Sequence, residues 1–414
     1  MPLKRSIRIP EEVRQKRRIA WLLLLVFAFA IPWEYSLDLG EPFGNIARIV
    51  GLLLLLAAIP AVLQSGRLRT PGAMQWLVLA FYLWFCCTCF WSIDPTVTLD
   101  KLRGFFQEMM VVWLVWEFAE SPADLRALMR AAVAGCWVLA LLTLANFASA
   151  EAVASDQIRF AATGQDPNDM ARFLDMAFPF SALMVNSERH WPWRLLAAGY
   201  LPLGFIAVLL TASRSGFLAA LVALAGSGFL LAYGHPKRVL AGVMALPPLA
   251  AVLWFTVPHG TFERLATITE QLQHGDLNQR LNIWHAGWQA FVRAPFFGTG
   301  AGSFVSAAGL APIDTAHNTA LSIVVSGGLV ALFIATAIVA AAIWAITQTS
   351  GQLKGALATA LLVWIVTSMV ATVEESRTTW LLLAIIALAG RIAVEQPEEL
   401  ATCFSVGERT PQAS

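Results

Sequence analysis

The feature that most constrains the fold of this chain is its succession of apolar runs, each close to the length of a membrane-spanning helix. A helix needs about 20 mostly apolar residues to cross the hydrocarbon core of a bilayer. Runs near this length lie at 19–34, 46–64, 73–91, 103–119, 126–149, 170–186, 194–212, 215–233, 238–257, 318–347, 355–373 and 378–396. We therefore expect an all-α polytopic membrane protein with about twelve transmembrane helices.

The composition supports this class of protein. Of the 414 residues, 58% are hydrophobic and 13% are charged, whereas a soluble globular chain is roughly half apolar and about a quarter charged. The net charge of +1 says nothing about nucleic acid, but the sequence has no basic stripe interleaved with aromatic residues, so we expect no nucleic-acid partner. Cys86, Cys87 and Cys89 lie inside one apolar run without a histidine or carboxylate close by. We interpret them as small buried hydrophobes and not as metal ligands.

The distribution of Lys and Arg predicts how the helices are oriented in the membrane. The N-terminal segment 1–18 is strongly basic, and basic segments are retained in the cytoplasm. With alternating helices, the loops that carry Lys or Arg then fall on the cytoplasmic side, at 65–72, 121–130, 187–194, 234–238 and 348–354. The acidic or nearly neutral loops fall on the outer side, at 36–45, 92–100 and 150–169. We expect both termini in the cytoplasm.

One outer loop, residues 258–317, is far longer than an ordinary connection between helices. Part of it has apolar residues at the spacing of one helix face, namely Leu281, Trp284, Trp288 and Phe291. Asp276 or Asn278 could cap the start of this helix, which fits either a surface helix against the membrane or a lid over a site. The chain thus divides into a cytoplasmic N-terminus (1–18), nine helices (19–257), the outer loop (258–317), three helices (318–396) and a cytoplasmic tail (397–414).

Three polar side chains lie at the predicted outer edge of the membrane. His317 directly precedes an apolar run, and Asn318 beside it could orient the ring; taken alone, such a histidine is more often a structural hydrogen-bonding residue. Arg214 lies in a very short turn near hydrocarbon, where a charge marks function unless it snorkels to the headgroups. Arg280 begins the predicted loop helix, where free N–H groups and a guanidinium form an anion site, although a solvated arginine is the plainer interpretation.

Lys and Arg are usually depleted from loops on the outer side, so further cations there favour an anionic ligand. These cations are Arg48, Lys101, Arg103, Arg159 and Arg172. The outer segments contain no DxD, HExxH or CxxC motif, so we expect no metal, and the glycines of 298–303 lack the context of a nucleotide-binding loop. Arginine matches phosphate through forked hydrogen bonds, and histidine accepts a proton near neutral pH. A sugar on a polyprenyl pyrophosphate suits both groups, because its lipid lies in the bilayer and its pyrophosphate at the interface.

Several segments resemble the O-antigen ligase and O-antigen polymerase superfamily of bacterial envelope enzymes. They are "FWSIDPTVTLDKLRG", "GQDPNDMARFLDMAFPF", "LLTASRSGFLAAL", "QRLNIWHAGWQAFVRAPFFGTGAGSF" and "DTAHNTALSIVVSGGLVAL". The resemblance covers most of the chain from about 75 to 335, and the order, spacing and sidedness of these weak motifs make it specific.

This resemblance implies an inner-membrane glycosyltransferase with its site facing the periplasm. It would transfer a glycan from undecaprenyl pyrophosphate to lipid A–core oligosaccharide, with inversion and without metal or other cofactor. By motif, Arg214 and Arg280 would bind the pyrophosphate and stabilise its developing charge, and His317 would take the proton of the acceptor hydroxyl. Arg48, Lys101, Arg103 and Arg159 would help to hold phosphates.

The single large outer loop late in the chain favours a ligase over an O-antigen polymerase or another lipid-linked glycan transferase. A transporter of lipid-linked sugars is a further alternative, since it also needs outer-side cations and many helices. Transporters often show inverted repeats and broken helices, and neither is detectable in this sequence.

Overall fold

The computed structural model describes residues 11–40, 43–66, 68–149, 159–232, 244, 247–248, 250–273, 275, 279–312 and 314–405. Within these residues the secondary structure is helical, apart from one isolated β-bridge between Asp38 and Asn45. The all-α prediction is therefore confirmed. The elements are α1 (Glu11–Ala30), η1 (Ile31–Ser36), α2 (Ile46–Ser65), α3 (Ala73–Cys87), η2 (Thr88–Phe90), α4 (Pro95–Phe118), α5 (Pro122–Ala148), α6 (Pro167–Ser187), α7 (Trp191–Leu210), α8 (Arg214–Ala232), α10 (His259–Ala266), α11 (Ile268–Gln273), α12 (Arg280–Arg293), α13 (Phe304–Ala308), α14 (Thr319–Gln348), α15 (Gly351–Ser368), α16 (Arg377–Glu395) and α17 (Pro397–Phe404).

Nine helices in the described part of the chain are long and apolar enough to cross a membrane, which confirms a polytopic membrane protein. The predicted runs at 103–119 and 170–186 correspond to α4 and α6, which are not among these nine helices. The predicted run at 238–257 falls largely outside the described residues. The total of about twelve transmembrane helices thus stays a prediction.

The helix α6 lies at the centre of the bundle, packed against α5, α7, α8 and α15. Almost all of its side chains are buried, including Arg172 and Asp175. Polar residues inside a membrane bundle are rare and usually functional. Asp166 caps the helix by accepting hydrogen bonds from the amides of Asn168 and Asp169, so the buried helix begins with a polar turn at one end of the bundle.

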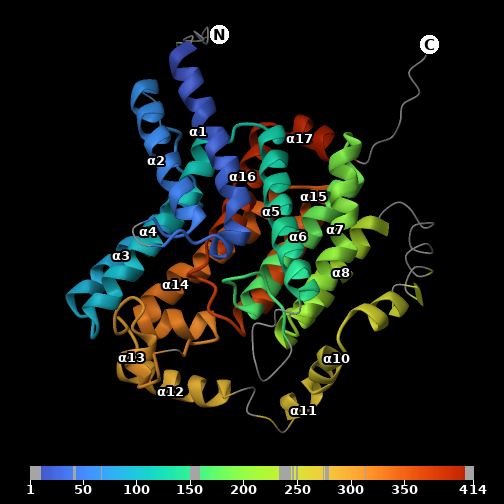
Figure 1. The fold of residues 1–414 in the computed structure, drawn as a ribbon. Coiled ribbons are helices and arrows are strands. Elements are labelled where there is room, and N and C mark those ends of the chain that lie inside the picture. The colour runs from blue at the N-terminus through green and yellow to red at the C-terminus, as the bar shows by residue number, and fades with distance from the viewer. Residues whose placement is uncertain are drawn as a thin grey trace, which may run out of the picture.

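The bundle has two distinct ends. The N-terminal end of α1 and the helix α17 lie at one end, and α10 to α13 lie at the other (Figure 1). At the first end, ion pairs join residues at or next to the segments that the sequence places on the cytoplasmic side: Arg17 to Glu117 at 2.8 Å, and Arg130 to Glu188 at 2.6 Å. The predicted outer loops gather at the opposite end. The side of the membrane on which each end lies remains a prediction.

The helix α14 is broken at Gly328, where φ is 70° and ψ is −170°. The chain segment after α12 fills this break: the amide of Leu329 donates to the carbonyl of Pro295, and the amide of Thr299 donates to the carbonyl of Val325. The sequence did not reveal the break. Because α14 begins directly after His317, the outer loop and the histidine are fixed to the same broken helix.

The helix α12 exists where the sequence predicts one, but its buried face differs from the prediction. Leu281 and Trp288 are exposed, and the buried residues are Ile283, Gly287 and Ala290. Small residues allow the close approach to α13 and α14 that larger side chains would prevent, and the large apolar side chains are left outward, as on an interfacial helix. Asp276 and Asn278 lie outside the described residues, and the residue preceding α12 is Gln279, whose side chain makes no cap.

The cysteines of α3 and η2 also differ from the prediction. Cys87 is exposed, and Cys86 and Cys89 are only half-buried. The helix α3 packs against α4 and α14 and leaves its remaining surface outward. The interpretation as buried hydrophobes was therefore wrong for Cys87, whereas Cys86 and Cys89 are partly buried against the core.

Candidate functional site

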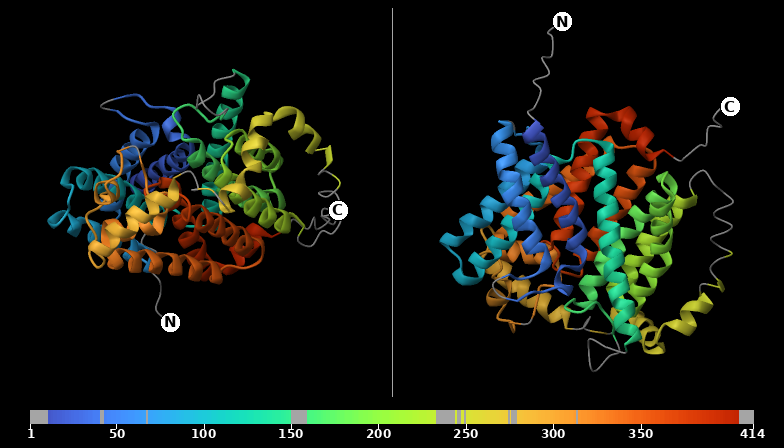
Figure 2. Two further views of the ribbon diagram at one scale, coloured as in Figure 1. Left: turned by 90° about the horizontal axis from the view of Figure 1, so that it is seen from below. Right: turned by 45° about the horizontal axis from the view of Figure 1, so that its top comes forward.

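A cavity of about 830 Å³ opens at the end of the bundle that carries α12 and α13. Seen from this end, the α12–α13 segment lies beside α14, and α10 lies toward α8 (Figure 2, left). Residues from seven regions line the cavity: Tyr35 on η1, Asp94 and Lys101 on α4 and its cap, Asp166 to Phe173 on α6 and its cap, Arg280 on α12, Gly302 to His317 around α13, Ser322 on α14, and Val370 to Ser376 before α16. Segments far apart in the sequence thus meet at one polar pocket.

Of the residues singled out from the sequence, His317, Arg280 and Lys101 line this cavity, as does Arg172. Arg214 lies outside the lining but close enough for its charge to act on Arg280: burial and then Arg214 lower the pKa of the Arg280 guanidinium.

Two predicted residues are not brought to the cavity. Arg48 is exposed near the start of α2, and its backbone amide is capped by Asn45. Arg103 is exposed on α4, paired with Asp100 at 2.8 Å, and faces a separate hollow. The charge pattern of the sequence gave the correct end of the bundle for both residues but not the face on which they lie.

A cluster of four arginines adjoins the cavity: Arg159, Arg214, Arg264 and Arg280. Burial and then the charge of Arg159 and Arg214 lower the pKa of Arg264 to about 10. Burial likewise lowers the pKa of Arg159, opposed by Asp166 and reinforced by Arg214. We call these four residues the arginine cluster.

The arginine cluster differs from the other cations of this region in having no acidic partner. Lys101 is paired with Glu375, and Arg172 is paired with Asp169. Among the described residues, none of the four cluster arginines forms an ion pair within 4.0 Å. Guanidinium groups that repel one another without a carboxylate partner are suited to bind an anion with several charges.

The backbone at the site is strained. Three residues other than glycine have a left-handed conformation in the described part of the chain: Ala212 at φ 48°, Gln279 at φ 66° and His317 at φ 46°. Each either is, or lies within two positions of, a residue predicted from the sequence to be functional. Such backbone strain occurs mainly at functional sites, where the surrounding structure enforces it.

His317 is half-buried at the edge of the cavity. Burial and then the Arg280 charge lower the pKa of the His317 imidazole, opposed by Asp166 and Asp314. The ring is therefore neutral at pH 7 and can accept a proton. Asn318 does not orient the ring: its side-chain oxygen caps α14 by accepting from the amide of Leu321, and its Nδ2 donates to the carbonyl of Met369.

The structure adds residues that the sequence analysis passed over. Arg264 on α10 was missed, although it is a cation in a predicted outer loop and meets the criterion applied to the others. Asp166 and Glu375 were missed because their roles depend on contacts between distant segments. Next to Glu375 in the sequence is Glu374, whose pKa is raised to about 8 by burial and then by the Glu375 charge.

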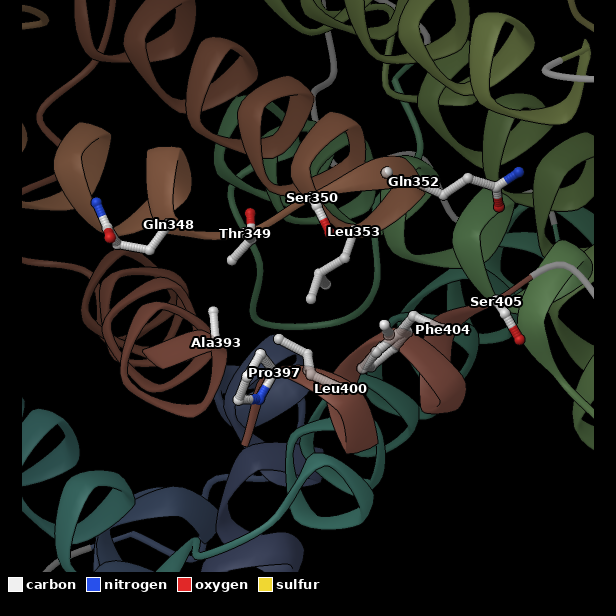
Figure 3. Close-up of a pocket in the computed structure, with 12 residues that line it drawn as sticks. Gln348, Thr349, Ser350, Gln352, Leu353, Ala393, Pro397, Leu400, Phe404 and Ser405 are labelled. Carbon is white, nitrogen blue, oxygen red and sulfur yellow. The ribbon is translucent and has the colours of Figure 1, made fainter. Parts of the chain in front are cut away.

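A second cavity, of about 300 Å³, lies at the opposite end, between the turn that joins α14 and α15 on one side and α17 on the other (Figure 3). Its lining contains hydroxyl, amide and apolar side chains such as Thr349, Ser350 and Phe404, and no charged residue. It therefore offers neither the charge nor the proton acceptor found at the first cavity.

Residues 199–336 of the chain match a protein-family model described as O-Antigen ligase. The matched segment contains Arg214, Arg264, Arg280 and His317, and it ends just after the break in α14. No curated protein matches the chain.

Proposed function

We propose, because residues 199–336 match a family model described as O-Antigen ligase, that this chain transfers O-antigen glycan from undecaprenyl pyrophosphate to lipid A–core oligosaccharide in lipopolysaccharide biosynthesis. This match supports a lipid-linked glycan transferase of the ligase or polymerase type. The ligase role, the two substrates, and a location in the inner membrane with the cavity open to the periplasm are parts of the proposal.

The observation that carries this proposal is the arginine cluster beside an imidazole. Four guanidinium groups without acidic partners suit a pyrophosphate, which carries several negative charges at the membrane interface. His317 on the cavity wall suits an acceptor hydroxyl that must lose a proton. A cavity of about 830 Å³ has room for sugar residues next to both groups.

In the proposed reaction, the acceptor hydroxyl attacks the anomeric carbon of the donor sugar while His317 accepts the hydroxyl proton. The bond between the anomeric carbon and the pyrophosphate oxygen breaks, and its electron pair leaves with undecaprenyl pyrophosphate. Arg214 and Arg280 stabilise that charge as it develops. A single displacement of this kind inverts the anomeric centre. The guanidinium groups supply the positive charge, so the transfer needs no metal.

Lys101 and Arg159 help to position phosphate or sugar groups in this proposal. Lys101 lines the cavity, although Glu375 neutralises its charge. Arg159 belongs to the arginine cluster. Arg48 and Arg103 face away from the cavity, and we propose no part for them in the site.

The proposal is tested with the purified full chain in nanodiscs, a polyprenyl-linked glycan donor, lipid A–core and a chelator. We expect one glycan to be transferred to lipid A–core, with the chelator having no effect. Lengthening of the donor glycan without added acceptor would replace the ligase by a polymerase. Movement of intact donor across the bilayer, with no transfer to any acceptor, would support a transporter and overturn the enzyme proposal.

A further inference from the structure

The side chains of Arg214 and Arg264 each donate a hydrogen bond to a backbone carbonyl of the other's segment. The Nε of Arg214 donates to the carbonyl of Arg264 at 3.2 Å, and the Nε of Arg264 donates to the carbonyl of Ala212 at 2.9 Å. These two bonds fasten α10 to the short turn between α7 and α8. The carbonyl that accepts from Arg264 belongs to Ala212, one of the three residues with a left-handed backbone. The hydrogen bond from Arg264 therefore helps to hold Ala212 in this strained conformation.

Arg159 approaches the same turn from the loop before α6. Its Nε donates to the carbonyl of Thr211 at 2.9 Å, and one terminal nitrogen donates to the side chain of Asn168 at 2.9 Å. Arg159, Arg214 and Arg264 thus all use Nε to bind a backbone carbonyl. The terminal nitrogens of Arg214 and Arg264 make no hydrogen bond to any described residue. A guanidinium held in this way keeps its outer fork open for an oxyanion.

The surroundings of Arg264 disfavour its positive charge. Its guanidinium is partly desolvated beside two other cations, and its lowered pKa reflects both effects. A purely structural tie to the carbonyl of Ala212 could be made by a neutral donor such as an amide, without this repulsion. A charged group at this position is therefore better explained by an anionic ligand.

We propose that Arg264 is a third pyrophosphate-binding arginine, which α10 brings to the same group that Arg214 and Arg280 bind. This inference rests on the proposed function. If it is correct, two helices of the long outer loop, α10 and α12, contribute arginines to the donor site, and not α12 alone.

The test measures binding of inorganic pyrophosphate, without metal, to the full chain in nanodiscs, together with the donor KM. We expect Arg264→Gln, which keeps a hydrogen-bond donor but removes the charge, to weaken pyrophosphate binding roughly tenfold or more. The donor KM should rise more than kcat falls. Arg264→Lys, which keeps the charge but loses the fork, should fall between Arg264→Gln and the unsubstituted protein.

Arg293→Gln is the matched control. Arg293 lies on the same loop, is exposed, and donates to the carbonyl of Ala307 at 2.7 Å, so it makes the same kind of bond outside the arginine cluster. Its substitution should leave pyrophosphate binding within about twofold of the original value. If Arg264→Gln binds pyrophosphate as tightly as the control, or loses only thermal stability, the inference is overturned.

The two proposals fail in different ways. If Arg264→Gln leaves transfer activity unchanged, the inference about Arg264 is wrong and the ligase proposal stands. Pyrophosphate binding that depends on Arg264, in a protein that transfers no glycan, removes the ligase and keeps the anion site.

Discussion

The left-handed backbone of His317 determines which substitution isolates its chemistry. Asparagine tolerates positive φ better than alanine does, so His317→Asn removes the imidazole with the least disturbance of the loop. We expect transfer to fall roughly 10²–10⁴-fold, the usual contribution of a general base, with little change in thermal stability. Transfer rate and melting temperature are measured on the same preparation.

His285→Asn provides the control for that substitution. His285 lies on α12, where its ring is hydrogen-bonded to Gln289 at 2.9 Å, and it does not line the cavity. Its replacement should leave transfer nearly unchanged. Full activity in His317→Asn, or an equal loss in His285→Asn, would show that the imidazole at position 317 is not the proton acceptor.

The environment of His317 also predicts a pH dependence. Because burial and then the Arg280 charge lower the pKa of His317, the acid limb of the kcat/KM profile should lie at lower pH than the titration of an ordinary histidine. Asp314→Asn removes a carboxylate that favours the protonated ring, so the pKa should decrease and the acid limb should move to lower pH. If the acid limb of Asp314→Asn moved to higher pH or did not move, the pH dependence of transfer would not report the titration of His317.

At the residue scale, the sequence predicted which end of the bundle each cation lies on but not which cations converge. Loop sidedness follows from charge and helix count, and it was enough to single out Arg214, Arg280 and His317. The position of a side chain around its helix and the presence of an acidic partner depend on packing. This is why Lys101 proved to be paired and Arg103 faced elsewhere. Arg264 was overlooked although loop sidedness alone was enough to include it.

At the scale of the element, the break in α14 connects the outer loop to His317. A Cβ at Gly328 would lie 2.1 Å from the carbonyl oxygen of Phe296, at a φ of +70°. Gly328→Ala should therefore destabilise the protein by at least about 2 kcal/mol. It should also lower transfer, because the segment that packs into the break would be displaced. Thermal unfolding in detergent and the transfer assay measure the two effects.

Gly228→Ala on α8 is the comparison. Apart from the backbone of α8 itself, no atom of a described residue lies within 4 Å of a Cβ built there. Alanine also favours helix over glycine, so stability should stay the same or rise slightly. If Gly328→Ala behaves like Gly228→Ala, the tight contact at the break does not hold the loop.

Helix positions followed well from hydrophobic runs, because the bilayer sets both their length and their composition. Helix faces did not follow, as α12 and α3 show. Apolar residues in a membrane protein suit both the bundle interior and the lipid or its interface, so an apolar stripe does not reveal which side is packed. On α12, the packed side is marked instead by Gly287 and Ala290, which are small enough for close contact.

At the scale of the whole molecule, the distribution of Lys and Arg among the loops agrees with the alternation of the helices, and together they predict one orientation in the membrane. Loops assigned to the cytoplasm are joined by ion pairs at one end, and the cavity lies at the other. The proposed reaction requires that the cavity face the periplasm, since lipid-borne donor and acceptor would meet there. This orientation makes the accessibility of each end a test of the entire site.

The test uses single cysteines in a chain whose own five are replaced, namely Cys86, Cys87, Cys89, Cys136 and Cys403. Ala311→Cys lies on an exposed stretch beside the cavity, and Glu399→Cys lies on the exposed side of α17. In cells with a permeabilised outer membrane, an impermeant thiol reagent should label Ala311→Cys at once and Glu399→Cys only after lysis. The reverse pattern would place the arginine cluster in the cytosol, away from any periplasmic donor, and the ligase proposal would fail with it.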